Sequence, residues 1–146
     1  MEIACDPKLI FDYVTNSNRW HEWYPSSEPS NEQYFANEVG HKFEIVTVQK
    51  PISILPFLIK KTLSYTVSKL EYGKIWQIHA SSDLIDSITT YTLTPIKEGT
   101  LFKREFRYTT RGWLSILEPV LLRKNIIFQA SAGLNNLKEI IESEGV

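Results

Sequence analysis

The sequence predicts an α+β fold in which an antiparallel sheet is followed by one long C-terminal helix. Three observations lead to this prediction. Apolar residues recur at helical spacing in residues 7–23, apolar and polar residues alternate between about residues 39 and 110, and helical spacing returns over residues 113–144. Helices, then a run of strands, then a helix is an element order typical of α+β layer architectures.

The first helical segment predicts two short helices near the N-terminus. Asp6 suits the N-cap and Pro7 the first helical position. The Asn16-Ser17-Asn18 cluster ends this helix, and a second short helix carries Trp20 and Trp23. We expect the two tryptophans to pack under the end of the sheet, with ligand contact as the alternative.

The alternating segment predicts an antiparallel meander. Tyr72-Gly73-Lys74 and Lys97-Glu98-Gly99 are turn signals between alternating runs, and short strands joined by tight turns pair with their neighbours. The run ending at Pro95 is rich in β-branched residues. The expected strands are GHKFEIVTVQ, TLSYTVSKLE, KIWQIHASS, SITTYTLTP and LFKREFRYTT.

The last segment predicts the long helix. Its apolar residues form one stripe when the whole segment is taken as helical. Pro119 must kink or break the helix near its start, because its ring clashes with the carbonyl four residues earlier. The stripe consists of Trp113, Ile116, Leu117, Val120, Ile127, Leu134, Leu137 and Ile141.

Composition narrows the function classes. A chain of 146 residues fits one domain spanning residues 1–146. Its net charge of −1 argues against nucleic acid as a partner, because phosphate neutralisation needs an excess of Lys and Arg. Cys5 is the single cysteine, so no internal disulfide can form. With neither a signal-peptide pattern nor an apolar run long enough to span a membrane, we expect a cytoplasmic protein.

No motif assigns a metal, a cofactor or a catalytic residue. His21, His41 and His79 lie in different elements without zinc-ligand spacing, so we expect no metal. The scattered glycines form no phosphate-binding loop, and no nucleophile elbow is present. We therefore expect no cofactor and leave the catalytic residues unassigned.

Arg104 is the strongest candidate for ligand binding. Alternation places it on one face with Phe102, Phe106 and Tyr108, which we take as the concave face. A charged side chain among apolar ones requires a partner or a ligand. Arg104 could bind a carboxylate, a phosphate or an enolate oxygen through paired hydrogen bonds. The alternatives are a structural carboxylate partner or a guanidinium that reaches solvent.

Aromatic residues on the strands are the other candidates. Trp76, Tyr91, Phe106 and Tyr108 could line a cavity, since they combine a large apolar surface with a few polar atoms. The alternative is an ordinary core. Alternation predicts that His79 faces outward. Asp83 and Asp86 flank a strand connection, where turn residues are commoner than an acid–base pair.

Two apolar stretches precede basic pairs. Residues 52–59 lead to Lys60-Lys61, and residues 113–122 lead to Arg123-Lys124. Such segments contact anionic membranes in some peripheral proteins. Packing in the core, with solvated ends, is the commoner explanation, so peripheral membrane contact remains an alternative.

Several local strings, in this order, resemble the START-like, Bet v 1-like (SRPBCC) superfamily of helix-grip proteins. Within it the chain is most similar to the polyketide cyclase/dehydrase and lipid-transport branch. The resemblance covers nearly the whole chain, and its specificity lies in order and spacing. The strings are DPKLIFDYVTNSNRWHEW, YTLTPIKEGT, LEPVLL and NLKEIIE.

The resemblance implies a curved sheet wrapped around the long helix, with a cavity between them. Only MEIAC precedes Asp6-Pro7, whereas the family begins with a full strand, so we expect that strand to be at most a stub. Either the true start lies upstream of this sequence, or the sheet edge is open. An open sheet edge could pair with another chain, as in a homodimer. Because the family includes cyclases, hydrolases, transporters and binding proteins, it does not imply one activity.

Three functional hypotheses follow. The first is binding or transport of a hydrophobic small molecule, such as a lipid, a fatty acyl group or a polyketide-like aromatic compound, with Arg104 holding its polar head. The second is a cyclase or dehydratase that holds such a molecule in one folded geometry. The third is a protein–protein interaction domain.

Overall fold

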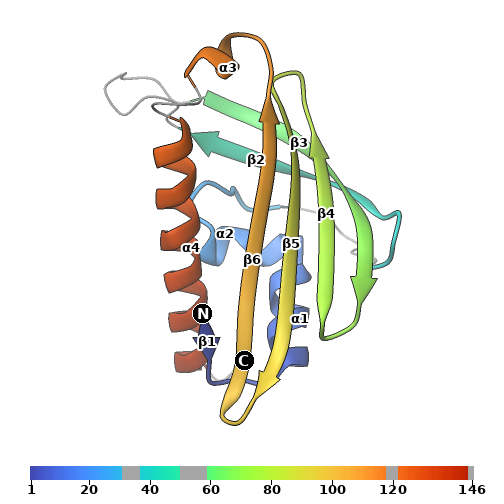
Figure 1. Cartoon of the computed structure of the whole chain (residues 1–146), viewed down its shortest axis with the longest axis vertical. Helices are drawn as coiled ribbons and strands as arrows, with labels where there is room; N and C mark the ends of the chain where they lie inside the picture. The colour runs from blue at the N-terminus through green and yellow to red at the C-terminus, as the bar shows by residue number, and fades with distance from the viewer. Residues whose placement is uncertain (31–36, 50–58, 118–121, 145–146) are drawn as a thin grey trace.

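The structure is a computed structural model that describes residues 1–30, 37–49, 59–117 and 122–144. Six strands form one antiparallel sheet, and the helices flank it (Figure 1). The elements in chain order are β1 (Glu2–Ile3), α1 (Pro7–Thr15), a 3-10 turn η1 (Ser17–Arg19), α2 (Trp20–Trp23), β2 (Lys42–Gln49), β3 (Ile59–Glu71), β4 (Ile75–Ser81), β5 (Ile85–Ile96), β6 (Gly99–Thr110), α3 (Trp113–Leu117) and α4 (Arg123–Glu144).

The sheet is the meander that the alternation predicts. Its strand order is β1-β6-β5-β4-β3-β2, so each strand from β2 to β6 pairs with the next along the chain. The β3–β4 turn contains Gly73 at φ 71°, and the β5–β6 turn ends at Gly99 at φ 138°. A Cβ at Gly99 would collide with the carbonyl oxygen of Ile3, so glycine is required there by backbone packing as well.

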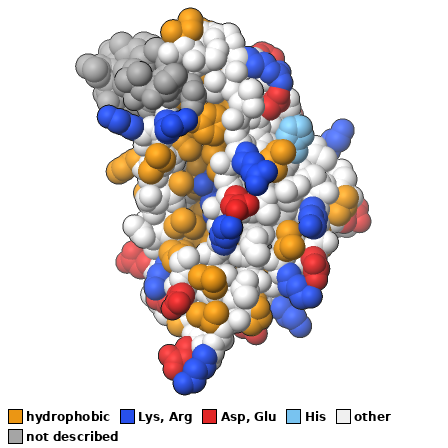
Figure 2. Space-filling view, in the orientation of Figure 1, with side chains coloured by type: hydrophobic (Ala, Val, Ile, Leu, Met, Phe, Trp, Pro, Cys, Tyr) orange, Lys and Arg blue, Asp and Glu red, His pale blue; other side chains and the backbone are white. Residues whose placement is uncertain are grey.

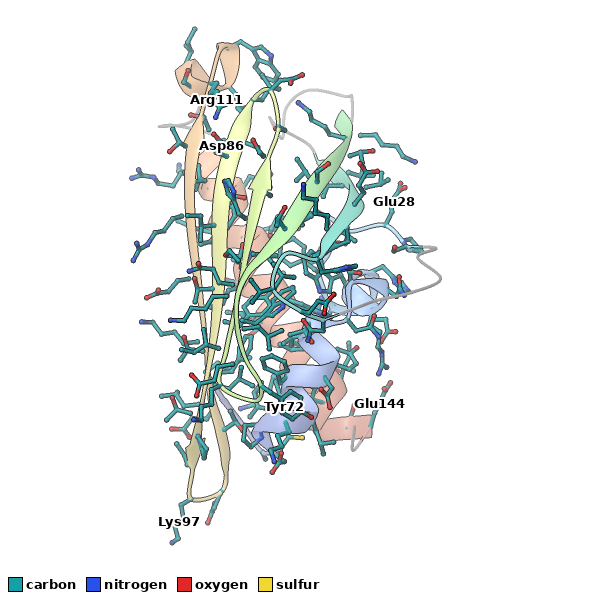
Figure 3. All side chains as sticks on the ribbon, turned by 90° about the vertical axis from the view of Figure 1, so that its right-hand side faces the viewer. Glu28, Tyr72, Asp86, Lys97, Arg111 and Glu144 are labelled. Carbon is teal, nitrogen blue, oxygen red and sulfur yellow. The ribbon has the colours of Figure 1, made fainter. Side chains whose placement is uncertain are left out.

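The helices lie against the concave face of the sheet, which curls around them at β2 and β3 (Figure 3). The Asp6 side chain caps α1 by accepting a hydrogen bond from the Lys8 amide at 2.8 Å. Buried Ile10, Phe11 and Val14 of α1 and Leu137 and Ile141 of α4 join the strand residues in one core. This arrangement confirms the predicted helix-grip fold with two short N-terminal helices.

The predicted apolar stripe of the last segment is wrong in its first half. Ile116 is 79% exposed and Ile127 is 59% exposed, whereas Leu137 and Ile141 are buried. The chain forms two helices, α3 ending at Leu117 and α4 beginning at Arg123. The prediction treated the whole segment as one helix, whereas α3 and α4 are separate elements, so their residues need not share a face. Pro119 lies outside the described residues, as do residues 52–58 of the earlier apolar stretch.

The first strand is short, as expected. β1 pairs Glu2 with Leu101 and Ile3 with Thr100 at the start of β6. The Met1 amino group donates to the Phe102 carbonyl at 2.9 Å, and the Phe102 amide donates to the Met1 carbonyl at 2.8 Å. Beyond Phe102, no described strand pairs with this edge of β6. In the fold, this edge of β6 faces the first turns of α4 (Figure 1).

Among the described helices, none is long and apolar enough to span a membrane.

Candidate ligand-binding site

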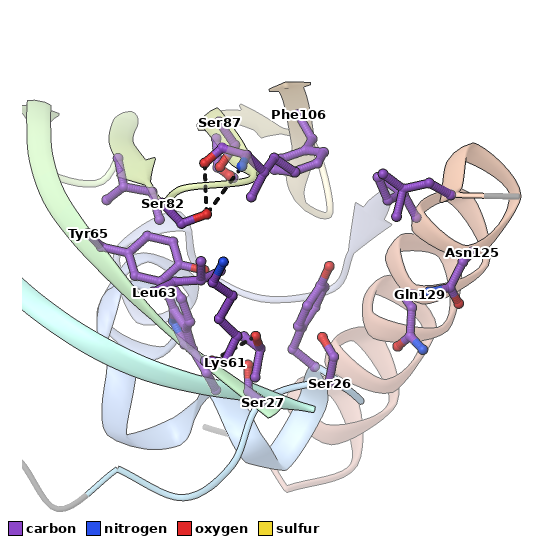
Figure 4. A pocket seen from close by; sticks show the side chains of 18 of the residues that line it. Ser26, Ser27, Lys61, Leu63, Tyr65, Ser82, Ser87, Phe106, Asn125 and Gln129 are labelled. Carbon is purple, nitrogen blue, oxygen red and sulfur yellow. Dashed lines mark hydrogen bonds between the residues drawn. The ribbon is translucent and has the colours of Figure 1, made fainter. Parts of the chain in front are cut away.

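A cavity of about 140 Å³ lies between the concave face of the sheet, the first half of α4 and the segment that follows α2 (Figure 4). This volume is comparable to cavities that hold one aromatic ring. The lining is mostly apolar and aromatic. It includes Trp20, Trp23, Tyr24, Ser26, Leu63, Tyr65, Ile78, Leu84, Ser87, Tyr91, Arg104, Phe106, Trp113, Leu114, Leu122, Asn125, Ile126 and Gln129.

A packed aromatic cluster lies next to the cavity, behind its lining residues Tyr91 and Trp20. The Tyr91 ring stacks on Trp76 at 5.5 Å, and Trp20 meets Trp76 edge-on at 6.1 Å between ring centroids. The indole nitrogens of two residues are satisfied, since Trp20 donates to the Val14 carbonyl at 2.9 Å and Trp76 donates to Asn37 Oδ1 at 2.9 Å. Such interlocked rings hold the Tyr91 hydroxyl in a fixed place.

Arg104 enters this aromatic surrounding from β6. Its guanidinium carbon lies 5.2 Å from the Tyr24 ring centroid and 5.4 Å from that of Phe106, so the cation is held between two aromatic rings. Its Nη2 donates a long hydrogen bond of 3.5 Å to the Tyr24 hydroxyl. Its Nε is buried and has no hydrogen-bond partner. No carboxylate in the described part of the chain forms an ion pair with it.

Three further cavity-lining residues carry a buried polar atom without a partner. These atoms are Trp23 Nε1, Ser26 Oγ and Gln129 Oε1. A buried polar atom without a partner destabilises a fold by about 1–3 kcal/mol, so native proteins rarely leave one unpaired without a reason. Here the four residues with such an atom, Arg104 included, line one hollow. The arrangement suits a bound molecule or waters that supply the missing partners.

Two tyrosine hydroxyls of the cavity stay protonated at physiological pH. Burial raises the pKa of Tyr65 well above its ordinary range, and the neighbouring Tyr24 and Tyr91 raise it further. Burial also raises the pKa of Tyr91, while the charge of Arg104 opposes that shift. Both side chains can therefore donate a hydrogen bond or a proton to a bound molecule.

Three of the five residues proposed from sequence line the cavity, namely Tyr91, Arg104 and Phe106. Trp76 is not among the lining residues, because it is fully buried beneath Tyr91 and beside Trp20. Tyr108 stacks on Phe106 at 5.5 Å and faces a separate groove between β6 and α4. Trp20 and Trp23, expected to pack under the sheet end, are buried there and also line the cavity.

The weaker candidates lie away from the cavity. His79 is exposed, and His41 stacks on Phe43 at 5.9 Å. Asp86 forms an ion pair with Arg111, and Asp83 is exposed. Within the described ranges, no three His, Cys, Asp or Glu side chains converge as a metal site would require.

Several lining residues were missed by sequence reasoning. Leu63 and Tyr65 follow the alternation of β3, so a decision on which face is concave would have found them. Ser26 lies in an irregular segment, and Gln129 lies at a polar position of α4, so neither produces a periodic signal. Their inward placement depends on how α2 and α4 dock on the sheet.

Solved structures share this fold at low sequence identity. The di-domain ARO/CYC StfQ of the steffimycin biosynthetic pathway matches with a TM-score of 0.72 and 18% identity, over 100% of this chain and 50% of that one. A Thermus thermophilus protein matches at 0.70 and 12%, over 100% and 96%. The Aha1 dimer of Colwellia psychrerythraea matches at 0.65 and 16%, over 98% and 92%. At these identities the likeness shows the fold alone.

None of the curated proteins matches the chain. The family described as polyketide cyclase/dehydrase and lipid transport does match, over residues 1–142. That range contains every described strand, both N-terminal helices and nearly all of α4. The chain therefore belongs to the polyketide cyclase/dehydrase and lipid transport family.

Proposed function

We propose that this protein binds or carries a hydrophobic small molecule in the cavity between the sheet and α4. The observation that carries the proposal is Arg104, a cation held among aromatic rings with its Nε buried and unpaired. Ligands of the proposed class are a lipid, a fatty acyl group or a polyketide-like aromatic compound. The apolar part would contact the aromatic lining, and the polar head would bind Arg104.

Physical chemistry supports this assignment. A guanidinium moved out of water without a counter-charge is costly, and a fold retains such a group where a ligand supplies the missing charge. A carboxylate or phosphate oxygen could accept from Arg104 Nε while Tyr91 and Tyr24 donate to the same head. Most of the remaining surface of the cavity is apolar, with serine, threonine, amide and Lys61 side chains among it, as small-molecule sites combine apolar surface with a few polar groups.

Native mass spectrometry of the protein purified from its own source tests the proposal. We expect a co-purified mass that organic extraction releases as a lipid, an acyl compound or an aromatic acid. Arg104→Met should lose most of it, because the head group loses its charged partner. Lys103→Met is the matched control, since Lys103 lies next on β6 and is exposed. Wild-type protein that is empty and binds no amphiphile when titrated would contradict the proposal.

A cyclase or dehydratase is the second candidate, and one observation favours it. Tyr91 is held in its protonated form beside Arg104, so a proton donor and an anion-binding group share one cavity. Turnover should then fail in Tyr91→Phe while binding of a substrate analogue persists. A steady-state assay with a poly-β-ketone substrate, together with an affinity titration, separates the two effects. Equal loss of binding and turnover would favour a carrier.

The proposal has two further parts, peripheral membrane contact and self-association. Trp113 and Ile116 of α3 and Phe128 of α4 are exposed, and α4 begins with the basic residues Arg123 and Lys124, a combination that a contact with anionic lipid requires. Sedimentation with anionic and with neutral vesicles tests that contact.

The unpaired edge of β6 and the Aha1 dimer among the similar folds favour a homodimer or another protein partner. We expect a concentration-dependent size in gel filtration if that edge pairs with a second chain. A size that stays monomeric at every concentration would contradict the homodimer.

A further inference from the structure

A second hollow lies beside the cavity, between β6 and the first two turns of α4. Its volume is about 500 Å³, and it is more open than the cavity. Hydrophobic side chains gather along this seam, with Lys and Arg side chains at its upper end (Figure 2). We call it the β6–α4 groove. Its lining residues are Arg104, Phe106, Arg107, Tyr108, Arg123, Ile126, Ile127 and Ala130.

Among the described residues that line the groove, all the charged ones are basic. Three of the eight lining residues are arginines and none is acidic, although the whole chain has a net charge of −1. The nearest acidic residue along β6, Glu105, is paired with Lys103 at 2.6 Å. Arg107 and Arg123 line the groove and are exposed, within reach of a molecule that enters it. This concentration of positive charge favours an anion.

The groove and the cavity are neighbouring parts of one site. Arg104, Phe106 and Ile126 line both of them. Arg104, whose Nε is buried and unpaired, is therefore a residue that the two hollows share. A molecule with its apolar part in the cavity would bring its other end past Arg104 into the groove.

We propose that the β6–α4 groove binds the anionic end, a carboxylate or a phosphate monoester, of an amphiphile whose apolar part occupies the cavity. This inference rests on the proposed function and adds the charge and the placement of the ligand's head. Arg104 binds the head from the buried side. Arg107 and Arg123 bind it from the solvent side, where it keeps part of its hydration.

The two volumes agree with this division. The cavity of about 140 Å³ holds a ring or a short acyl segment, and a longer molecule has to extend into the groove. Ile127 and Tyr108 supply apolar surface beside the arginines, so the groove can contact methylene groups next to a charged head. A neutral amphiphile would gain the same apolar contacts without the charge interactions.

Affinity titrations with decanoate, decyl phosphate and decanol test the inference, with tryptophan fluorescence as the readout because Trp20, Trp23 and Trp113 line the cavity. The wild type should bind the two anions at least about tenfold more tightly than the alcohol, as charge-assisted hydrogen bonds imply. The variant Arg107→Gln/Arg123→Gln should lose most of this preference and bind decanol within about twofold of the wild type. The difference between the two anions shows whether a carboxylate or a phosphate fits better.

The matched control is Lys103→Gln/Lys138→Gln. It removes one charge from each of the same two elements, at positions that do not line the groove. We expect it to keep the preference for anions, which excludes a loss caused by net charge alone. If decanol binds as tightly as the anions, or if the control loses the preference equally, the groove inference fails and the proposed function stands. If no amphiphile binds the wild type, the proposed function itself fails.

Discussion

The two halves of α4 differ in how they contact the rest of the fold. In the C-terminal half, Leu137 and Ile141 are buried in the core, and Glu142 accepts a hydrogen bond from the Ala4 amide at 2.9 Å. In the N-terminal half, Phe128 is 69% exposed and Gln129 faces the cavity with an unpaired Oε1. One continuous helix thus joins a packed end to an end that leaves space beneath it.

The comparison shows how a small domain separates stability from binding. Apolar burial of the C-terminal half stabilises the fold, while the N-terminal half borders the hollow with Gln129 and lies opposite Arg104 of β6, each of which has a buried polar atom without a partner. Regions with fewer buried apolar contacts also open at lower free energy. Substitutions in the two halves should therefore have different signatures, and the largest should come from the packed end.

Leu137→Ala should lower the free energy of unfolding by about 2–5 kcal/mol, because it removes buried methyl groups and leaves a cavity. Leu137 is fully buried against the sheet, at 0% exposure. Urea denaturation followed by circular dichroism measures the change. Ile127→Ala, in the other half of the same helix, should change it by less than about 0.5 kcal/mol. Equal losses at the two positions would show that the first turns of α4 also pack as core.

Arg104→Met should act in the opposite direction on stability. Replacing a buried charge that lacks a counter-ion with an apolar side chain of similar length should raise the free energy of unfolding by about 1 kcal/mol or more. The same variant should bind anionic amphiphiles poorly. Thermal denaturation without ligand and the titrations above measure the two effects. A large loss of stability would instead mean that the two flanking rings and the cation form a structural unit.

Gly133→Ala tests the junction between the halves. A Cβ there would lie 2.9 Å from Cδ2 of Tyr24, closer than such atoms approach, so the ring must move. The higher helix propensity of alanine offsets part of that strain, and we expect a net loss of roughly 1 kcal/mol. Because the Tyr24 ring contacts Arg104, affinity for an anion should also fall.

Ser131→Ala is the control for that variant. Ser131 is exposed on the same helix, so alanine there should be neutral or slightly stabilising and should leave binding unchanged. If Gly133→Ala proved as stable and as tight-binding as this control, the contact between α4 and Tyr24 would have no part in placing Arg104.

Alternation predicted the sheet well because each strand buries one face. Phe43 and Ile45 are buried and Glu44 between them is exposed, as a period of two requires. The same alternation placed Arg104 and Phe106 on the concave face, where they line the cavity. These predictions depend only on local geometry, which the sequence specifies directly.

The remaining features depend on how distant elements dock. Trp76 and Tyr91 are paired across β4 and β5, so their side chains point to the same face of the sheet. Trp20 nevertheless covers Trp76, while Tyr91 lines the cavity. Periodicity cannot distinguish a covered inward position from an uncovered one. The predicted stripe likewise treated α3 and α4 as one helix, and Ile127 of α4, which it placed on the apolar face, is exposed.

The last prediction concerns pH and has the smallest effect at neutral pH. Burial raises the pKa of Tyr65 in the folded state, so the unfolded chain releases that proton first as pH rises. The contribution of the Tyr65 hydroxyl to the free energy of unfolding is fully present below the ordinary tyrosine pKa of about 10. It is lost as the pH rises through the raised pKa of the folded state.

Tyr65→Phe should therefore match the wild type near neutral pH, since no described group hydrogen-bonds to its hydroxyl, and should lose less stability in alkali. Chemical denaturation at a series of pH values gives the slope of the free energy of unfolding against pH for the wild type and for the variant. Parallel slopes would show that the Tyr65 hydroxyl is hydrated through the cavity mouth. A shallower slope for the variant would show that the hollow excludes water well enough to strengthen the interaction between Arg104 and an anionic head.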